Sequence, residues 1–304
     1  MSSYRYTSFP ASFNGAGLSL TQMGGGSIAL GQNLNTYFPD GAVDAAAVIL
    51  NSAKPTFRIP TRDLTTVFGV VSPTVGYSCT SSSVFRLQQR LDGAVFAGST
   101  SNVTATAPLG FLAPESLSAS GDQPAELGLM FYALSSTGAA TSLPVTFANS
   151  VDFTAITPAH VSTFYLGPAY ANSVVMNGLI ASSIDFGINF DTLMHDGTVY
   201  PTEGSVSRRS PRVRLTFLKA DMIYTLTPNV FNTATPGTFA LYYRKGSPGN
   251  ARIADATASH CKISFATGAQ MATAVQAAGE TDATISWDVI PTAPVSVSVS
   301  SAIP

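Results

Sequence analysis

The sequence repeats part of itself. Residues 183–223 align without a gap with residues 27–67 at an offset of 156 positions, and ten of the 41 aligned pairs are identical. The identical pairs include glycines, prolines and an Asp-Gly turn, which are residues that determine backbone geometry. In the earlier segment they are Ser27, Ile28, Gly31, Asn33, Thr36, Asp40, Gly41, Val43, Pro55 and Arg58. A chain with such a repeat is restricted to folds built from two similar units.

A second block of similarity follows in the same order. Residues 106–127 align with residues 264–285 at an offset of 158, which pairs Gly110 with Gly268. Two blocks at nearly the same offset indicate an internal duplication.

The length agrees with two units, because 304 residues is about twice the size of a typical domain. We therefore predict two similar domains, at 1–150 and 151–304. The first begins with an aromatic and glycine-rich arm, residues 1–26, and the second ends with an arm at residues 291–304. The N-terminal arm is equally compatible with a first strand and a loop.

The composition favours strands and buried surfaces. Charged residues make up 11% of the chain and hydrophobic residues 45%, whereas about 25% charged is usual. Such a chain fills a core easily but has few charges to keep its surface apart from its neighbours. Abundant Val, Thr, Phe and Tyr favour strands and surfaces that are buried against other subunits. The alternative is an ordinary β-rich soluble protein.

Hydrophobic residues with a period of two indicate strands in both units. Ile184, Phe186, Ile188 and Phe190 would share one face of a strand, with polar residues or glycine on the other face. Residues 212–217 alternate in the same way. A turn is expected between these two strands at His195-Asp196-Gly197.

Few helices are expected. Residues 63–70 and 219–226 each fit a short helix or a further strand. Residues 269–278 are predicted to hold a short helix, and their counterpart in the first unit is predicted to be helical only after Pro114. The predicted fold is mainly β with a short helix per unit, in two tandem, similar β-sandwich or barrel-like domains.

The net charge and the cysteines indicate which partners and which cellular compartment suit the protein. The formal net charge is −2, which gives no general affinity for nucleic acid or anionic membranes. Cys79 and Cys261 are expected to be buried thiols, consistent with assembly in a reducing cytosol. No secretory signal and no membrane-spanning apolar stretch is recognised, so the protein is expected to be made in the cytoplasm without a membrane anchor.

Nothing in the sequence favours catalysis or a cofactor. The three histidines, His160, His195 and His260, have no metal-ligand spacing, and no nucleophile elbow, phosphate loop or CxxC pair is present. His195 beside Asp196 is interpreted as a solvated turn rather than a catalytic base with its orienting carboxylate. We therefore predict a protein that is not an enzyme and that needs no metal.

Four arginines within seven residues are the densest charge of the chain. They are Arg208, Arg209, Arg212 and Arg214. Such a cluster can bind phosphate, but its counterpart in the first unit keeps only Lys54 and Arg58, and no aromatic residues interleave for base stacking. We favour ion pairs between subunits or repeats, in which Arg is the preferred cation.

Two tandem β-rich units of about 150 residues, low charge, and the strand–loop–Pro–strand pattern of residues 187–217 together resemble the tail tube proteins of long-tailed bacteriophages. The resemblance implies that each unit is a twisted β-sandwich with a flanking helix. It also implies that six units, here three chains, close a ring around a lumen, and that rings stack into a tube in the virion tail. DNA would pass through the tube without specific binding.

The resemblance also implies partners and roles for residues. The partners are further copies of the chain and other tail proteins, namely the terminator, baseplate and tape measure proteins. The ring-stacking loop would contain His195, Asp196, Gly197, Asp40 and Gly41, and the terminal arms would dock on adjacent rings. Two alternatives stay open: a terminator, neck or baseplate ring protein, and a β-sandwich adhesin or carbohydrate-binding protein.

Overall fold

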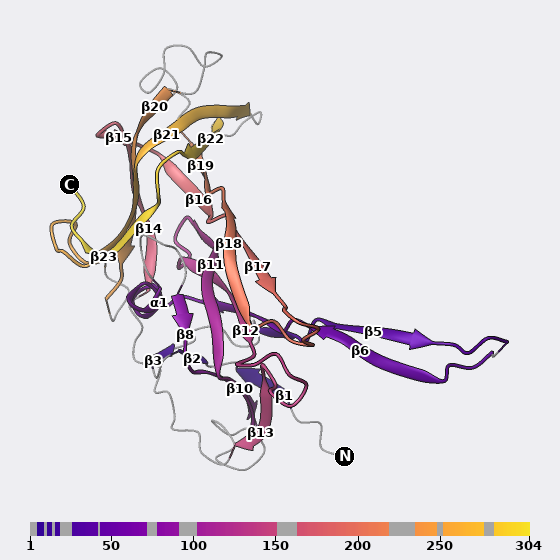
Figure 1. Cartoon of the computed structure of the whole chain (residues 1–304). Helices are drawn as coiled ribbons and strands as arrows, with labels where there is room; N and C mark the ends of the chain where they lie inside the picture. The colour runs from indigo at the N-terminus through magenta and orange to yellow at the C-terminus, as the bar shows by residue number, and fades with distance from the viewer. Residues whose placement is uncertain are drawn as a thin grey trace.

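The computed structural model confirms a mainly β protein. The residues it describes are 5–8, 11–13, 16–18, 26–41, 43–71, 78–90, 102–150, 163–218, 235–247, 252–276 and 283–304. Within these ranges the only helix is α1 (Leu64–Val70). All other regular elements there are strands, and every paired strand is antiparallel to its neighbour (Figure 1).

The larger sheet runs through both halves of the chain. In spatial order its strands are β15 (Val174–Met176), β14 (Phe164–Ala171), β20 (Thr235–Lys245), β21 (His260–Gln276), β22 (Thr284–Pro291), β19 (Arg212–Phe217), β16 (Leu179–Asp185), β11 (Leu109–Ser120), β12 (Glu126–Leu134), β7 (Thr56–Thr61) and β4 (Ser27–Ala29). Two short strands join it from the side, β23 (Ser296–Ser301) beside β21 and β8 (Ser78–Thr80) beside β11.

A smaller sheet and two hairpins complete the fold. The smaller sheet contains, in order, β13 (Thr146–Ser150), β10 (Asn102–Ala107), β9 (Ser83–Arg90), β2 (Ala11–Phe13) and β3 (Ala16–Leu18), with β1 (Arg5–Ser8) beside β9. The hairpins are β5 (Gln32–Tyr37) with β6 (Ala47–Ala53), and β17 (Ile188–Leu193) with β18 (Glu203–Arg209).

Aromatic side chains join the two sheets of the first half into a sandwich. Phe57 of β7 stacks on Phe85 of β9, with ring centroids 4.0 Å apart. Phe131 of β12 contacts Phe13 of β2 at 5.9 Å. All four rings are completely buried. Burial of an aromatic side chain stabilises a fold by about 2–3 kcal/mol, so this cluster anchors one sheet on the other.

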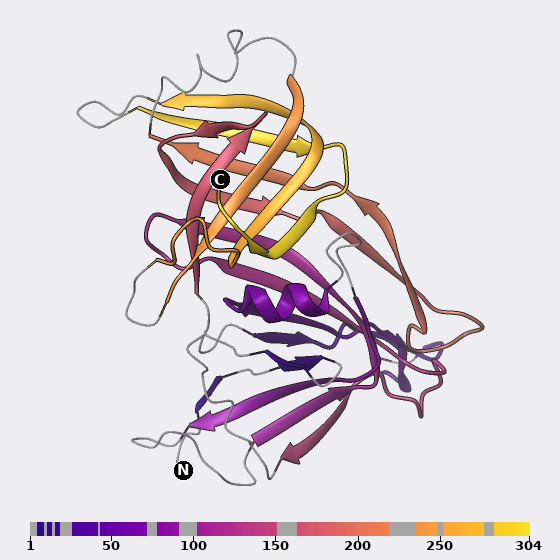
Figure 2. The ribbon, with the colours of Figure 1, turned by 90° about the vertical axis from the view of Figure 1, so that its left-hand side faces the viewer.

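Helix α1 lies between the two layers (Figure 2). The carboxylate of Asp63 accepts a hydrogen bond from the backbone N–H of Thr66 at 3.0 Å, which caps the N-terminus of the helix. Leu64, Val67 and Phe68 are buried on its inner face. Residues 63–70 are therefore helical, one of the two possibilities that the sequence left open. Their counterpart at 219–226 lies outside the described residues.

The strand registers of the first half recur in the second half. The hairpin β5–β6 places Gln32 opposite Ala53, and β17–β18 places Ile188 opposite Arg209, which are the positions 156 residues later. Both hairpins shift register after an asparagine, Asn33 in one and Asn189 in the other. The same agreement relates β4–β7 to β16–β19, β7–β12 to β19–β22, β9–β10 to β20–β21, β2–β3 to β14–β15, and β11–β12 to β21–β22.

The chain therefore contains two units with the same arrangement of strands. Strand β21 corresponds to both β10 and β11, which are separate strands on either side of Pro108. The larger sheet connects the two units without interruption. Duplication as the origin of this arrangement, and the domain limits 1–150 and 151–304, stay predictions.

Two helix predictions are wrong. Residues 269–276 belong to β21, and the segment after Pro114 belongs to β11. The Ala, Gln and Met residues of β21 favour a helix locally. They form a strand because their backbone pairs with β22, and tertiary pairing outweighs local propensity. Pro114 is accommodated because the ladder between β11 and β12 is bulged between Pro114 and Ser116.

Parts of both predicted arms pair with this chain's own strands. Within residues 1–26, β1 and β2 pair with β9, and β3 pairs with β2. The alternating Val and Ser residues of the C-terminal segment form β23, which pairs with β21. For these described stretches the strand interpretation is the one observed, and docking of the arms on adjacent rings stays a prediction.

Candidate subunit interface

The strand pair β11–β16 joins the two units within the larger sheet. Five residues of β11 pair in register with five of β16, from Ser116 opposite Asp185 to Ser120 opposite Ala181. Within this ladder Leu117 lies opposite Ile184, and both side chains are completely buried. Backbone hydrogen bonds and an apolar pair thus close the joint between the units.

The two strands that correspond to this joint lie at opposite ends of one run of eight sheet strands. Strand β4 matches the end of β16, and the last residues of β21 match the end of β11. Ile28 therefore corresponds to Ile184, and Val275 corresponds to Leu117. Within the described part of the chain, β4 pairs only with β7, and residues 271–276 pair only with β22.

These two counterparts are less covered than the residues of the joint. The side chain of Val275 is 54% exposed, and Ile28 is half-buried against the core. An uncovered strand edge presents unpaired backbone N–H and C=O groups that pair readily with another strand. The described residues therefore contain one closed joint and two segments, equivalent to its two halves, that pair on one side only.

The hairpin β17–β18 adds a second contact between the units. Its Phe190 ring lies 4.5 Å from the ring of Phe111 on β11 and 5.1 Å from the ring of Tyr132 on β12. In the loop between β17 and β18, the carbonyl of Val199 accepts a hydrogen bond from the N–H of Ala53 at 3.0 Å, and the carbonyl of Pro201 accepts one from the N–H of Ser135 at 2.8 Å. The second hairpin is thereby held on the first unit.

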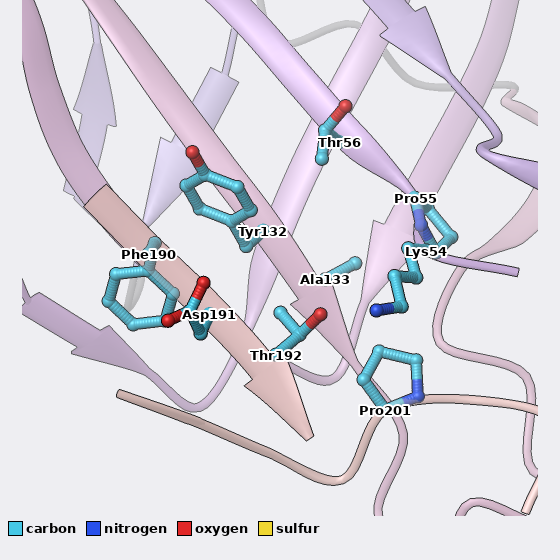
Figure 3. Close-up of a pocket in the computed structure, with 9 residues that line it drawn as sticks. All are labelled: Lys54, Pro55, Thr56, Tyr132, Ala133, Phe190, Asp191, Thr192 and Pro201. Carbon is cyan, nitrogen blue, oxygen red and sulfur yellow. The ribbon is translucent and has the colours of Figure 1, made fainter. Parts of the chain in front are cut away.

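Figure 3 shows this contact from the side of the hairpin. Phe190, Asp191 and Thr192 of β17 line an open pocket of about 440 Å³ together with Tyr132 of β12 and Thr56 of β7. Burial and the nearby charge of Glu115 raise the pKa of Tyr132 above its ordinary value, so its phenol stays protonated. Residues of both units line the pocket, which makes it part of the joint.

Among the described residues, the equivalent hairpin of the first unit, β5–β6, has no comparable cover beyond its base at Ala53. It projects away from the rest of the described chain (Figure 1), and every residue of β5 is exposed. Its exposed apolar side chains are Leu34, Tyr37, Phe38, Val43, Val48 and Ile49. A concentration of apolar groups on a projecting hairpin is typical of an interaction surface.

The predicted ring-stacking residues lie on exposed turns at the ends of the two hairpins. Asp196 and Gly197 have φ angles of 50° and 72°, and the N–H of Thr198 donates to the carbonyl of His195 at 2.9 Å. Positive φ at both central positions defines a type I′ turn, which Asp-Gly favours. Nε2 of His195 lies 3.3 Å from a Glu203 carboxylate oxygen.

The first unit has the corresponding Asp40-Gly41 turn, with Gly41 at a φ of 80°. Both turns are exposed, and they lie on different hairpins. Their role in ring stacking stays a prediction.

The four arginines are spread along β18 and β19. Arg208 and Arg209 end β18, and Arg212 and Arg214 lie on β19, all four exposed. Arg212 forms an ion pair with the buried carboxylate of Asp288 on β22 of the same chain. Ion pairing between subunits stays a prediction for this cluster.

The cysteines differ from the prediction that both are buried. Cys261 is completely buried, which raises the pKa of its thiol to about 12. Cys79 is exposed, so that part of the prediction is wrong. It lies on the short strand β8, which packs at the margin of the sheet beside β11. In the described residues no three His, Cys, Asp or Glu side chains gather in a way that could hold a metal ion.

The pairing of Leu117 with Ile184 at the joint is not predicted by the sequence pattern. The identity of Ile28 with Ile184 was part of the aligned block, but the strand opposite each of them is not encoded in local periodicity.

The sequence matches no family model and none of the curated proteins. Among the described residues there is no helix long and apolar enough to cross a membrane.

Proposed function

We propose that this chain is a structural subunit that assembles head to tail by repeating its internal joint between molecules. The observation that carries the proposal is that β4 and residues 271–276 of β21 each pair on one side only within the described residues, whereas their counterparts are joined inside the chain. In the assembly, β4 of one copy pairs with β21 of the next. By the internal register, Ile28 lies opposite Val275, and Ser27 lies opposite Gln276.

An interface of this type is heterologous, because two different surfaces meet. Heterologous contacts close into a ring when the rotation per subunit divides a full turn, and otherwise form an open helix. The resemblance to tail tube proteins supports closure with six units, and therefore three chains. Closure also covers both strand edges, which removes the sites at which an exposed sheet aggregates.

We further propose that the rings stack into a tail tube of a bacteriophage-like particle and form a conduit for DNA. The low charge supports this role, since 15 Lys and Arg against 17 Asp and Glu give little attraction for phosphate. The partners are copies of the chain and the other tail proteins. No catalytic step and no cofactor enters this function.

Negative-stain electron microscopy at rising protein concentration tests the proposal. Hollow filaments of uniform width with a threefold repeat in end-on averages are the expected result. Single rings that never stack would replace the tube by a terminator or neck ring. Dispersed monomers at every concentration would refute self-assembly, and a glycan-binding screen would then test the adhesin alternative.

A further inference from the structure

We propose that hairpin β5–β6 of one copy docks on strands β21 and β22 of the adjacent copy, with Leu34 against Ala269 and Ile290. This inference rests on the proposed head-to-tail assembly and extends it. It makes the hairpin a clasp across the subunit boundary, in addition to the strand pairing at the edge of the sheet.

The geometry comes from the equivalent hairpin inside the chain. Hairpins β5–β6 and β17–β18 have the same register and the same bulge, and Leu34 occupies the position of Phe190. Phe190 rests on Phe111 and Tyr132, which lie opposite each other on β11 and β12. The residues at those positions in the second unit are Ala269 and Ile290, which also lie opposite each other. Leu34 therefore has a defined counterpart surface.

At each contact a large side chain on one surface meets a small one on the other. The large residue belongs to the sheet in the internal contact and to the hairpin in the external contact. In the internal contact Phe111 is large and Gly204 of β18 has no side chain. A Cβ at Gly204 would lie 2.6 Å from the Phe190 ring and 2.9 Å from the Phe111 ring. In the external contact the residue equivalent to Phe111 is small, Ala269, and the residue equivalent to Gly204 is Val48. The side chain of Val48 would thus fill part of the space that Phe111 occupies in the internal contact.

Exposure on both surfaces agrees with a missing partner. Leu34 is 55% exposed, Val48 is 60% exposed and Ile290 is 40% exposed. A two-stranded hairpin alone is marginally stable in water. Covering these side chains would remove apolar surface from water on both sides of the contact.

The partner surface belongs to a second molecule. Hairpin β5–β6 leaves the sheet at β4 and β7, whereas β21 and β22 lie at the other end of the run β21-β22-β19-β16-β11-β12-β7-β4. At about 4.8 Å per strand, those ends are on the order of 30 Å apart along the sheet. The internal hairpin β17–β18 also crosses to the neighbouring unit. When the same contact is repeated between molecules, hairpin β5–β6 lies on the next chain.

Crosslinking between two singly substituted chains tests the clasp. All variants carry Cys79→Ser, so that no other exposed thiol of the described chain reacts. A Leu34→Cys chain is mixed with an Ile290→Cys chain and treated with a short bismaleimide. The matched control replaces the first variant by Asn35→Cys, whose side chain points to the opposite face of the hairpin. Edge pairing is measured in parallel by disulfide formation between Ile28→Cys and Val275→Cys chains.

The expected result is a crosslinked dimer from Leu34→Cys with Ile290→Cys, several times more abundant than with Asn35→Cys. Assembly of a Leu34→Arg chain should also be weakened relative to an Asn35→Arg chain. If the edge pair crosslinks but the Leu34 pair does not exceed its control, the clasp is refuted and the assembly stands. If neither pair crosslinks, both proposals are overturned.

Discussion

Leu117 of β11 and Ile184 of β16 lie opposite each other in the strand pair that joins the two units, and both are completely buried. Their counterparts, Val275 and Ile28, lie in residues 271–276 of β21 and in β4, two segments that pair on one side only within the described part of the chain. The described residues thus show the joint closed and, separately, two segments equivalent to its halves without a strand on the corresponding side. This relationship gives each interface residue a matched internal control.

The first prediction compares Leu117→Ala with Val275→Ala in the unassembled protein. Leu117→Ala should lower the free energy of unfolding by about 2–5 kcal/mol, because it creates a cavity at a fully buried position. Val275→Ala should change it by no more than about 0.5 kcal/mol, since the side chain is exposed there. Urea unfolding at a protein concentration below assembly measures both. Equal losses would show that Val275 is already covered within one chain.

The second prediction concerns the crowded position Gly204. Gly204→Val should destabilise the folded chain by about 1–3 kcal/mol, because its new side chain meets the rings of Phe190 and Phe111. Combining it with Phe111→Ala should recover part of that loss, since this pair reproduces the Val48 and Ala269 combination. A double-mutant cycle from urea unfolding gives the coupling energy. Strictly additive effects would argue against the size complementarity of the clasp.

The third prediction is a pH dependence from Asp255. Its carboxylate accepts two hydrogen bonds from Arg244, each 2.8 Å long, and this pairing holds the pKa of Asp255 below its ordinary value of 3.8. A lowered folded-state pKa means that the stabilisation is present above about pH 4 and is lost as the pH falls through the folded value. Asp255→Asn should therefore be less stable than the parent at pH 7, with the difference shrinking in acid.

Thermal unfolding of both proteins at pH 7 and near pH 3 measures this change. Arg244→Gln serves as the control, because removal of the other partner should abolish the same pH-dependent contribution. A difference in melting temperature that is unaltered by pH would exclude the pair as its source.

The fourth prediction concerns thiol reactivity. Burial keeps Cys261 protonated at neutral pH, and a thiol is a nucleophile only as its thiolate. The folded protein should therefore take up one equivalent of a maleimide, at the exposed Cys79, and the unfolded protein two. Mass spectrometry counts the labels. Rapid labelling of Cys261 in the folded state would contradict its burial.

The sequence predicted the repeated arrangement better than the contacts between the units. The block that aligns residues 27–67 with 183–223 corresponds to strand pairs of identical register, β4–β7 with β16–β19 and β5–β6 with β17–β18. Such registers follow from local patterns of glycines, turns and alternation, which the alignment detects.

The pairing of Leu117 with Ile184 was not predictable in this way, because it joins residues 67 positions apart whose sequences carry no mark of each other. The prediction of a helix at 269–278 was wrong for a related reason. Its Ala and Gln residues favour a helix locally, but a strand that pairs with β22 satisfies the backbone along its length. Both the β11–β16 pair and the β21–β22 pair depend on residues that are not neighbours in the sequence.

The most direct test of the account is disulfide formation in a single chain that carries Ile28→Cys, Val275→Cys and Cys79→Ser. Non-reducing electrophoresis after mild oxidation separates the products by the number of linked chains. Head-to-tail pairing predicts a ladder that ends at a closed ring of three chains, and a variant with Gln276→Cys in place of Val275→Cys, on the opposite face of the strand, should give little product. Only monomers after oxidation, with wild-type filaments also lacking, would contradict assembly through these two edges.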